Sequence, residues 1–258
     1  MPALDGELNF LAVGESGPPA LLLHGFGSDR SSWRLNQGEL GKVARTIAVD
    51  LPGHGLSPTD VGDGSVATLS RAVEAFADHH FREPAHLLGH SLGGAIAVDL
   101  ANRRPDLARS LFLVAPAWIG RRIDEAFLAR YVAMESVEEA EAVLRGLVAR
   151  PRLIGRQMAA AVLAELQRPG VRPALKTIAA SLVRAGPAVA AAAAAVGGMA
   201  LPKMVVWGAA DLTRAPDEAT LAALKAEVTV LADTGHLPHM ENSAEVNRLM
   251  RAFLATAA

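Results

Sequence analysis

The chain has 258 residues, of which 51% are hydrophobic, and 25 basic against 27 acidic residues give a formal net charge of −2. This length and composition predict one large domain, or a domain with an insertion, and argue against disorder. Without a basic stripe, nucleic acid and an anionic membrane surface are poor candidates for the main partner. The absence of cysteine excludes disulfides, thiolate metal sites and a cysteine nucleophile.

The start of the chain does not resemble a secretory signal. No Lys or Arg precedes Arg30, whereas a signal needs a basic start followed by an apolar run. We therefore expect a cytoplasmic protein. The alanine-rich stretch 188–195 is too short and too weakly apolar to span a bilayer, and we interpret it as a helix.

Short apolar runs alternate with stretches of helical periodicity along much of the chain. The runs predicted as strands are 8–13 at an edge, 20–23, 45–49, the run before Gly89, 110–114, 204–207 and 227–231. The predicted helices follow Trp33 and cover 69–81, 92–102, 218–225 and the end of the chain to about Leu254. This alternation predicts an α/β fold with a mostly parallel central sheet flanked by helices.

The alternation is interrupted between residues 117 and 201. This segment holds no run typical of a strand, only amphipathic helical windows. One window opens with Ser136 and Glu139 at the spacing of a capping box. We expect a helical cap over residues 117–201, inserted at the carboxyl edge of a core made of residues 1–116 and 202–258.

A Gly-x-Ser-x-Gly turn centred on Ser91 stands between a predicted strand and a predicted helix. In this context the serine is held in a strained conformation at the apex of the turn. Gly89 and Gly93 fit because a Cβ at either position would collide across the turn. The hydroxyl would stand beside a helix N-terminus, where developing negative charge is favoured, so we predict that Ser91 is a nucleophile.

A serine nucleophile needs a histidine base and a carboxylate that fixes the imidazole tautomer. His236 and Asp211 each follow a predicted strand, at the sheet edge where catalytic groups collect. We predict these two as base and acid. Asp233 is nearer to His236 in sequence but is typical of a turn.

Two backbone N–H groups are predicted to form an oxyanion hole. Leu92 directly follows the nucleophile, and Phe26 lies in the loop after a buried strand. Because backbone groups donate, the identity of either side chain is not critical, and losing one donor typically costs about 10²–10³ in turnover.

Several short motifs occur in the order found in α/β-hydrolases. They are His24-Gly25-Phe26-Gly27, Asp50-Leu51-Pro52-Gly53-His54-Gly55, Gly89-His90-Ser91-Leu92-Gly93-Gly94, Trp207-Gly208-Ala209-Ala210-Asp211 and Gly235-His236. Through their joint occurrence the chain resembles the α/β-hydrolases along nearly its whole length. The resemblance implies an α/β-hydrolase fold with the triad order Ser, Asp, His. Some members of this family place the acid after the preceding strand instead, but here that position, Val114-Ala115-Pro116-Ala117, offers no carboxylate, which favours Asp211.

The chain more narrowly resembles the hydrolase-like C-terminal domain of the acetyltransferase component of acetoin dehydrogenase. The shared residues are Asn36-Gln37, Gly62-Asp63-Gly64-Ser65, Ala115-Pro116-Ala117, Arg156-Gln157-Met158, Met240-Glu241 and Val246-Asn247. Those relatives carry an N-terminal lipoyl domain, whereas here the hydrolase pattern begins at once. The usual Asp-x-x-x-Pro is stretched to run from Asp211 to Pro216, which alters this loop.

The remaining polar and aromatic candidates are assigned to the pocket and its loops. His24 and His54 are expected to shape loops rather than bind metal, because no carboxylate–histidine cluster with ligand spacing accompanies them. Aromatic residues of the cap either line an acyl pocket or form the core of the cap. The pocket candidates are His24, Gly25, His90, Trp118, Phe127, Tyr131 and His239.

The sequence favours a cofactor-independent serine hydrolase that cleaves a small ester, thioester or related acyl compound, with no metal. A second hypothesis is acyl transfer to a thiol carrier, which follows from the acetoin dehydrogenase resemblance. A third is a non-catalytic binding protein that keeps the fold. Fold alone does not decide among these reactions. The sequence leaves the substrate and the oligomeric state, including a homo-oligomer, open.

Overall fold

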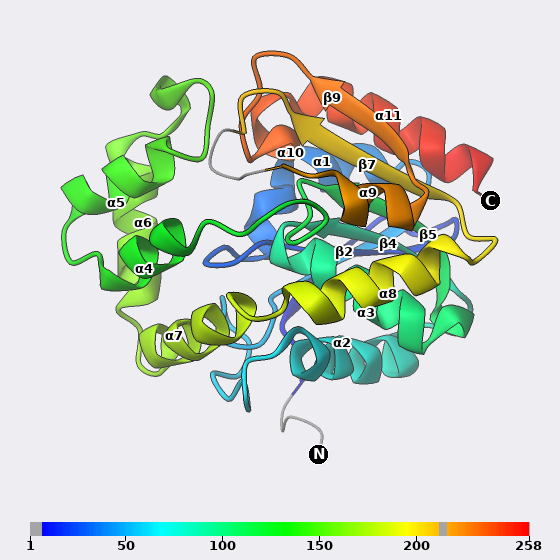
Figure 1. The fold of residues 1–258 in the computed structure, drawn as a ribbon, viewed down its shortest axis with the longest axis horizontal. Coiled ribbons are helices and arrows are strands. Elements are labelled where there is room, and N and C mark those ends of the chain that lie inside the picture. The colour runs from blue at the N-terminus through cyan, green and yellow to red at the C-terminus, as the bar shows by residue number, and fades with distance from the viewer. Residues whose placement is uncertain (1–6, 212–215, 258) are drawn as a thin grey trace.

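The structure, a computed structural model, describes residues 7–211 and 216–257. Its centre is a seven-stranded sheet in the order β1-β3-β2-β4-β5-β7-β9, parallel except for β1, which pairs antiparallel with β3 (Figure 1). The strands are β1 (Phe10–Val13), β2 (Pro19–Leu23), β3 (Arg45–Val49), β4 (Ala85–His90), β5 (Ala108–Val114), β7 (Lys203–Gly208) and β9 (Glu227–Leu231). The predicted mostly parallel α/β sheet is confirmed.

Helices cover both faces of the sheet, which explains why the central strands are apolar throughout. In β2, Leu21 and Leu23 join the hydrophobic cluster that contains side chains of α2 and α3. Leu22, one residue out of phase, joins the cluster with α1 and α11 on the other face. These helices are α1 (Arg34–Leu40), α2 (Val66–His80), α3 (Leu92–Arg103) and α11 (Ser243–Thr256).

The segment after β5 forms a set of helices beside the carboxyl edge of the sheet, at the left of Figure 1. They are α4 (Glu125–Ala133), α5 (Val137–Arg145), α6 (Arg156–Leu166) and α7 (Val171–Leu182). The last helix of the segment, α8 (Gly186–Gly197), instead packs against α3 and α9 (Glu218–Leu224). The helices beside the sheet edge are therefore α4 to α7, whereas α8 belongs to the helical layer of α3 and α9.

One short strand pair differs from the sequence prediction. Gly120–Arg121 forms β6, which pairs antiparallel with β8 (Pro216–Asp217), although no strand was expected between residues 117 and 201. Two residues, one of them glycine, carry no periodicity from which a strand could be predicted. In the stretched loop after Asp211, residues 212–215 lie outside the described part of the chain.

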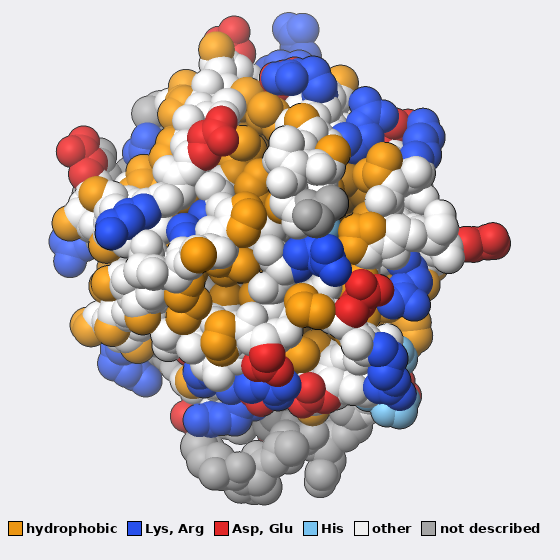
Figure 2. Space-filling view, turned by 90° about the vertical axis from the view of Figure 1, so that its right-hand side faces the viewer, with side chains coloured by type: hydrophobic (Ala, Val, Ile, Leu, Met, Phe, Trp, Pro, Cys, Tyr) orange, Lys and Arg blue, Asp and Glu red, His pale blue; other side chains and the backbone are white. Residues whose placement is uncertain are grey.

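The remaining short helices are η1 (Arg30–Trp33), η2 (Pro105–Leu107), η3 (Pro151–Leu153) and α10 (Pro238–Glu241). Among the described residues, no single helix is both long enough and apolar enough to cross a membrane. Only α7 and α8 taken together have the required length and composition, and these two helices are bent by 69° relative to each other. On the face shown in Figure 2, basic and acidic side chains are interspersed rather than gathered by sign.

Candidate active site

Ser91 lies in the tight turn between β4 and α3, with a positive φ of 51°. A Cβ added at Gly89 would lie 2.4 Å from the carbonyl oxygen of Gly93, and one at Gly93 would lie 2.2 Å from that of Leu23. Both distances are far below van der Waals contact. The turn therefore has the strain and the glycine requirement that the sequence predicted.

His236 and Asp211 are brought together from loops after β9 and β7. The Nδ1 of His236 lies 2.9 Å from Oδ2 of Asp211, and both side chains are buried. Nδ1–H donates to the carboxylate, which fixes the tautomer that leaves Nε2 able to accept a proton. Asp233 has a φ of 50° and so occupies a turn conformation, as expected.

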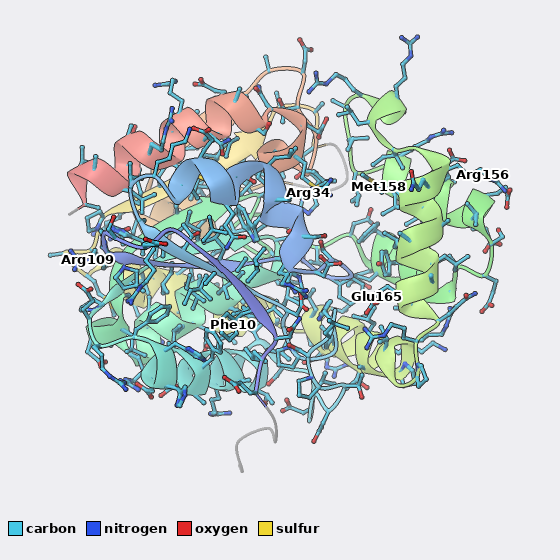
Figure 3. The ribbon with its side chains drawn as sticks, turned by 180° about the vertical axis from the view of Figure 1, so that it is seen from behind. Phe10, Arg34, Arg109, Arg156, Met158 and Glu165 are labelled. Atoms are coloured by element: carbon cyan, nitrogen blue, oxygen red, sulfur yellow. The ribbon has the colours of Figure 1, made fainter. Side chains whose placement is uncertain are left out.

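Ser91 and His236 line one cavity of about 610 Å³, which lies between the core and α4 to α6. This volume is typical of pockets for small organic ligands. The expected pocket residues His90, Phe127, Tyr131 and His239 contribute to its lining, together with Phe26. At its rim, Figure 3 shows Arg34 on the core side and Met158 and Glu165 on α6 across from it; all three line the cavity.

Three of the expected pocket residues do not belong to the lining of this cavity: His24, Gly25 and Trp118. The buried His24 accepts a hydrogen bond from the N–H of Leu51 (2.9 Å) at Nε2 and donates from Nδ1 to the carbonyl of Gly25 (2.8 Å). Burial lowers the pKa of His24 and keeps it neutral. Trp118 donates to the carbonyl of Leu182 (2.7 Å).

His54 acts in the same way within its loop. Its Nδ1 donates to the carbonyl of Pro52 (2.9 Å), and burial lowers its pKa to about 3. Both histidines are thus loop-shaping residues, as the sequence suggested. Gly25 lies behind the serine turn, since a Cβ there would come within 3.1 Å of the Cβ of Ser91.

The predicted oxyanion donors are the N–H of Leu92, at the start of α3, and the N–H of Phe26, in the loop after β2. Leu92 is the first residue of α3, so its N–H has no partner within the helix. The N–H of Phe26 makes no backbone hydrogen bond within the described residues. The Tyr131 hydroxyl, from α4, donates to the carbonyl of Gly27, and its ring packs edge-on against Phe26. The cap thus braces the loop that carries Phe26.

The rings of His90 and His239 are buried side by side, tilted by 43° to each other, and the ring of His90 lies 5.0 Å from that of His236. Nε2–H of His90 donates to the carbonyl oxygen of His236 (2.9 Å). The ring of His239 lies 4.5 Å from that of His90 and 4.6 Å from Trp33, and burial lowers the pKa of His239 to about 3. Both residues therefore support the loop of the base as well as lining the cavity.

Sequence reasoning did not assign a functional role to Glu241. Its carboxylate accepts hydrogen bonds from the N–H of Gly235, next to His236, and from the N–H of Ala149 in the cap segment. The only signal in the sequence was the Met240-Glu241 pair that contributed to the family resemblance.

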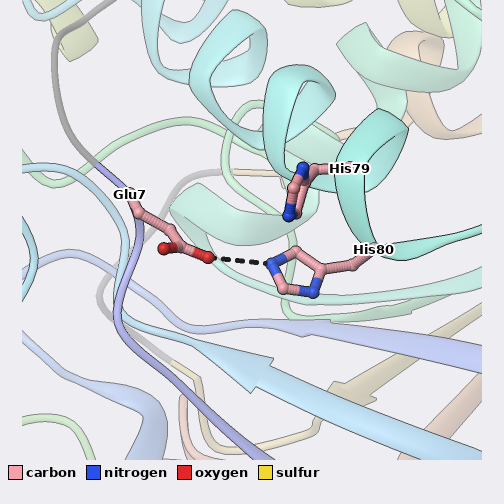
Figure 4. Close-up of side chains that lie close together, drawn as sticks. All are labelled: Glu7, His79 and His80. Atoms are coloured by element: carbon pink, nitrogen blue, oxygen red, sulfur yellow. Dashed lines mark hydrogen bonds and ion pairs between the residues drawn. The ribbon is translucent and has the colours of Figure 1, made fainter.

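One group of three side chains able to ligate a metal exists among the described residues. Glu7, His79 and His80 lie together at the end of α2, and Nε2 of His80 is 3.1 Å from Oε1 of Glu7 (Figure 4). The chain enters β4 shortly after α2 ends, so this group lies at the sheet edge opposite Ser91. It therefore takes no part in the chemistry of the serine site.

Comparison with known proteins identifies the family to which the chain belongs. Residues 20–249 match the family described as alpha/beta hydrolase. The acetyltransferase (dihydrolipoyllysine-residue) component of the acetoin cleaving system of Pseudomonas putida is 36% identical over 241 residues, which cover 93% of this chain and 64% of the relative. The chain thus spans less than two thirds of that relative.

A second relative matches over nearly its full length. The 2-hydroxymuconate semialdehyde hydrolase of Pseudomonas sp. strain CF600 is 30% identical over 251 residues, covering 94% of this chain and 88% of the relative. Among solved structures, a meta-cleavage product hydrolase of Pseudomonas fluorescens superposes with a TM-score of 0.84 at 23% identity, over 97% of this chain and 95% of the other. That likeness shows the fold.

Proposed function

The chain belongs to the alpha/beta hydrolase family, and on this premise we propose that it is a serine hydrolase cleaving a small ester, thioester or related acyl compound. The observation that carries the proposal is the buried contact of 2.9 Å between His236 and Asp211, with His236 lining the same cavity as the strained Ser91. These are the parts that activate a serine nucleophile.

In the proposed reaction, Oγ of Ser91 attacks the substrate carbonyl carbon while Nε2 of His236 takes the hydroxyl proton. The N–H groups of Phe26 and Leu92 donate to the developing oxyanion. Collapse expels the alcohol or thiol, which receives the proton from His236. Water, activated by the same imidazole, then cleaves the acyl–serine ester and restores Ser91. Asp211 stabilises the imidazolium at each stage.

The size and lining of the cavity support a small acyl substrate. Its volume of about 610 Å³ is bounded on the cap side by apolar residues such as Phe127, Leu144 and Leu147. Such a lining favours an apolar acyl group. A small-molecule substrate, with neither nucleic acid nor a membrane as partner, and a cytoplasmic location belong to the same proposal.

A second candidate is acyl transfer to a thiol carrier. It is favoured by the 36% identity to the acetyltransferase component of the acetoin cleaving system. The two reactions share the acyl-enzyme and differ only in the acceptor. Supplying acetyl thioester with and without dihydrolipoamide separates them: hydrolysis releases acetate at the same rate in both, whereas transfer forms acetyl-dihydrolipoamide.

The first test is labelling by a fluorophosphonate, combined with turnover of esters and thioesters of increasing acyl length. The wild-type protein should be labelled and should turn over short acyl compounds. Ser91→Ala should lose both, with a fall in turnover of at least about 10³. Equal labelling of the Ser91→Ala variant would contradict the assignment, and no labelling of the wild type would favour a binding protein.

A further inference from the structure

The loop that carries His236 is bonded directly to the cap segment that follows α5. The N–H of His236 donates to the carbonyl of Leu147 (2.7 Å), and the guanidinium of Arg150 donates to the backbone carbonyl of Glu241. The N–H of Ala149 donates to Oε2 of Glu241 (2.9 Å). The base loop is thus held by residues 147–150 as well as by the core.

Glu241 stands at the centre of this contact. One carboxylate oxygen accepts from the cap at Ala149, and the other accepts from the N–H of Gly235 (2.8 Å), the residue before His236. The side chain is buried, and among the described residues no Lys, Arg or His forms an ion pair with it. A buried carboxylate is costly to keep unless hydrogen bonds satisfy it, and here two backbone N–H groups do so.

The two segments approach backbone to backbone at Gly235. A Cβ there would lie 2.6 Å from the carbonyl oxygen of Leu147 and 2.7 Å from the nitrogen of Ala149. Atoms packed this closely cannot slide independently, so a displacement of residues 147–150 moves Gly235 and therefore His236. Leu147 also lines the cavity, which makes the same segment a contact surface for substrate.

We propose that Glu241 is a positioning residue that clamps the His236 loop to cap residues 147–150, so that the cap sets the geometry of the base. The inference rests on the proposed serine hydrolase function. Contact of the substrate with Leu147 would then change the position of His236, and so affect kcat as well as binding. A clamp of purely structural value would instead affect folding and leave the rate of the bound complex unchanged.

The test is Glu241→Gln, which keeps the size of the side chain but turns one acceptor into an NH₂ group facing a backbone N–H. We expect kcat to fall about 10–100-fold with KM changed less than about threefold, because small displacements of a catalytic group reduce rate rather than binding. The rate of fluorophosphonate labelling of Ser91 should fall by a similar factor, and the pH dependence of kcat/KM should shift.

The matched control is Glu245→Gln, a glutamate of α11 that pairs with Arg248 (2.6 Å) outside the cavity and should leave these rates unchanged. Arg150→Ala removes one of the two donors from the cap to Glu241 and leaves the residues of the base loop unchanged. This variant should also lower kcat, and it serves as the test if Glu241→Gln does not fold. The proposal would be overturned if the Glu241→Gln variant kept the wild-type kcat and pH profile and differed only in a lower unfolding midpoint.

Hydrogen exchange separates failure of the clamp from failure of the proposed function. Glu241→Gln should speed exchange at the amides of Gly235 and Ala149 whether or not the protein is a hydrolase. If exchange at both amides is unchanged, Glu241 does not hold the His236 loop to residues 147–150. Absence of labelling in the wild type, with faster exchange in the variant, would instead refute the hydrolase function and the catalytic role that rests on it.

Discussion

At the scale of one residue, the turn around Ser91 leaves no room for a methyl group at Gly93. The added carbon would lie 2.2 Å from the carbonyl oxygen of Leu23 in the neighbouring strand β2, and a strand backbone cannot give way. Gly93→Ala should lower the free energy of unfolding by about 1–3 kcal/mol and abolish labelling of Ser91. Urea denaturation followed by circular dichroism, together with the labelling assay, measures both effects.

Gly38 provides the matched glycine. It lies inside α1, where an added Cβ would meet no atom within 4 Å. Gly38→Ala should raise the free energy of unfolding by about 0.5–1 kcal/mol, because alanine restricts the unfolded chain and favours the helix. A loss of stability equal to that of Gly93→Ala would contradict the steric argument.

The contacts of single residues also show how far the candidate site could be predicted. Ser91, Asp211 and His236 could be singled out because each follows a strand and the order Ser, Asp, His is diagnostic. Glu241 could not, because it binds backbone N–H groups, one of them at Ala149 in a distant segment. His24 was assigned to the pocket, but its ring bonds to Leu51 behind it.

At the scale of elements, α5 begins with the capping box that the sequence predicted. Oγ of Ser136 accepts from the N–H of Glu139 (3.2 Å), and the Glu139 carboxylate accepts from the N–H of Ser136 (3.3 Å). Ser136→Ala should reduce the free energy of unfolding by about 1 kcal/mol. Ser136→Asp, which keeps a capping oxygen, should retain most of it; equal loss in both variants would argue against the cap.

Elements with a strong local signal were predictable, and those defined by a distant partner were not. The capping box and the apolar run of β3 are local, and both were placed correctly from the sequence. The pairing of β6 with β8 joins residues far apart in the chain and has no local pattern. Likewise, the alanine-rich sequence of α8 predicts a helix, but not which elements that helix contacts. In the structure it packs on α3 rather than with the cap helices.

At the scale of the whole molecule, buried neutral histidines link stability to pH. Burial lowers the pKa of His54 and of His239 to about 3 and that of His86 to about 4, against 6.5 in the unfolded chain. At pH values between the folded-state and unfolded-state pKa, the unfolded chain binds more protons than the folded one. The stability that these neutral histidines contribute is therefore fully present above pH 6.5, and it is lost as the pH falls towards the folded-state pKa values.

We expect the free energy of unfolding to fall by about 2 kcal/mol for each of these histidines between pH 7.5 and pH 5.0, measured by urea denaturation. The loss at pH 5.0 depends mainly on the unfolded-state pKa, because all three folded values lie well below 5. Glu241 has the opposite effect on the pH dependence of stability, since burial raises its pKa, but it is one group against three histidines.

The control is His86→Gln, in which a neutral amide faces Ser110. In this variant the loss of unfolding free energy between the two pH values should be smaller by the contribution of one histidine, about 2 kcal/mol. Equal stability of the wild type at both pH values would contradict the argument, because a histidine buried without charge in the folded state must take up its proton on unfolding.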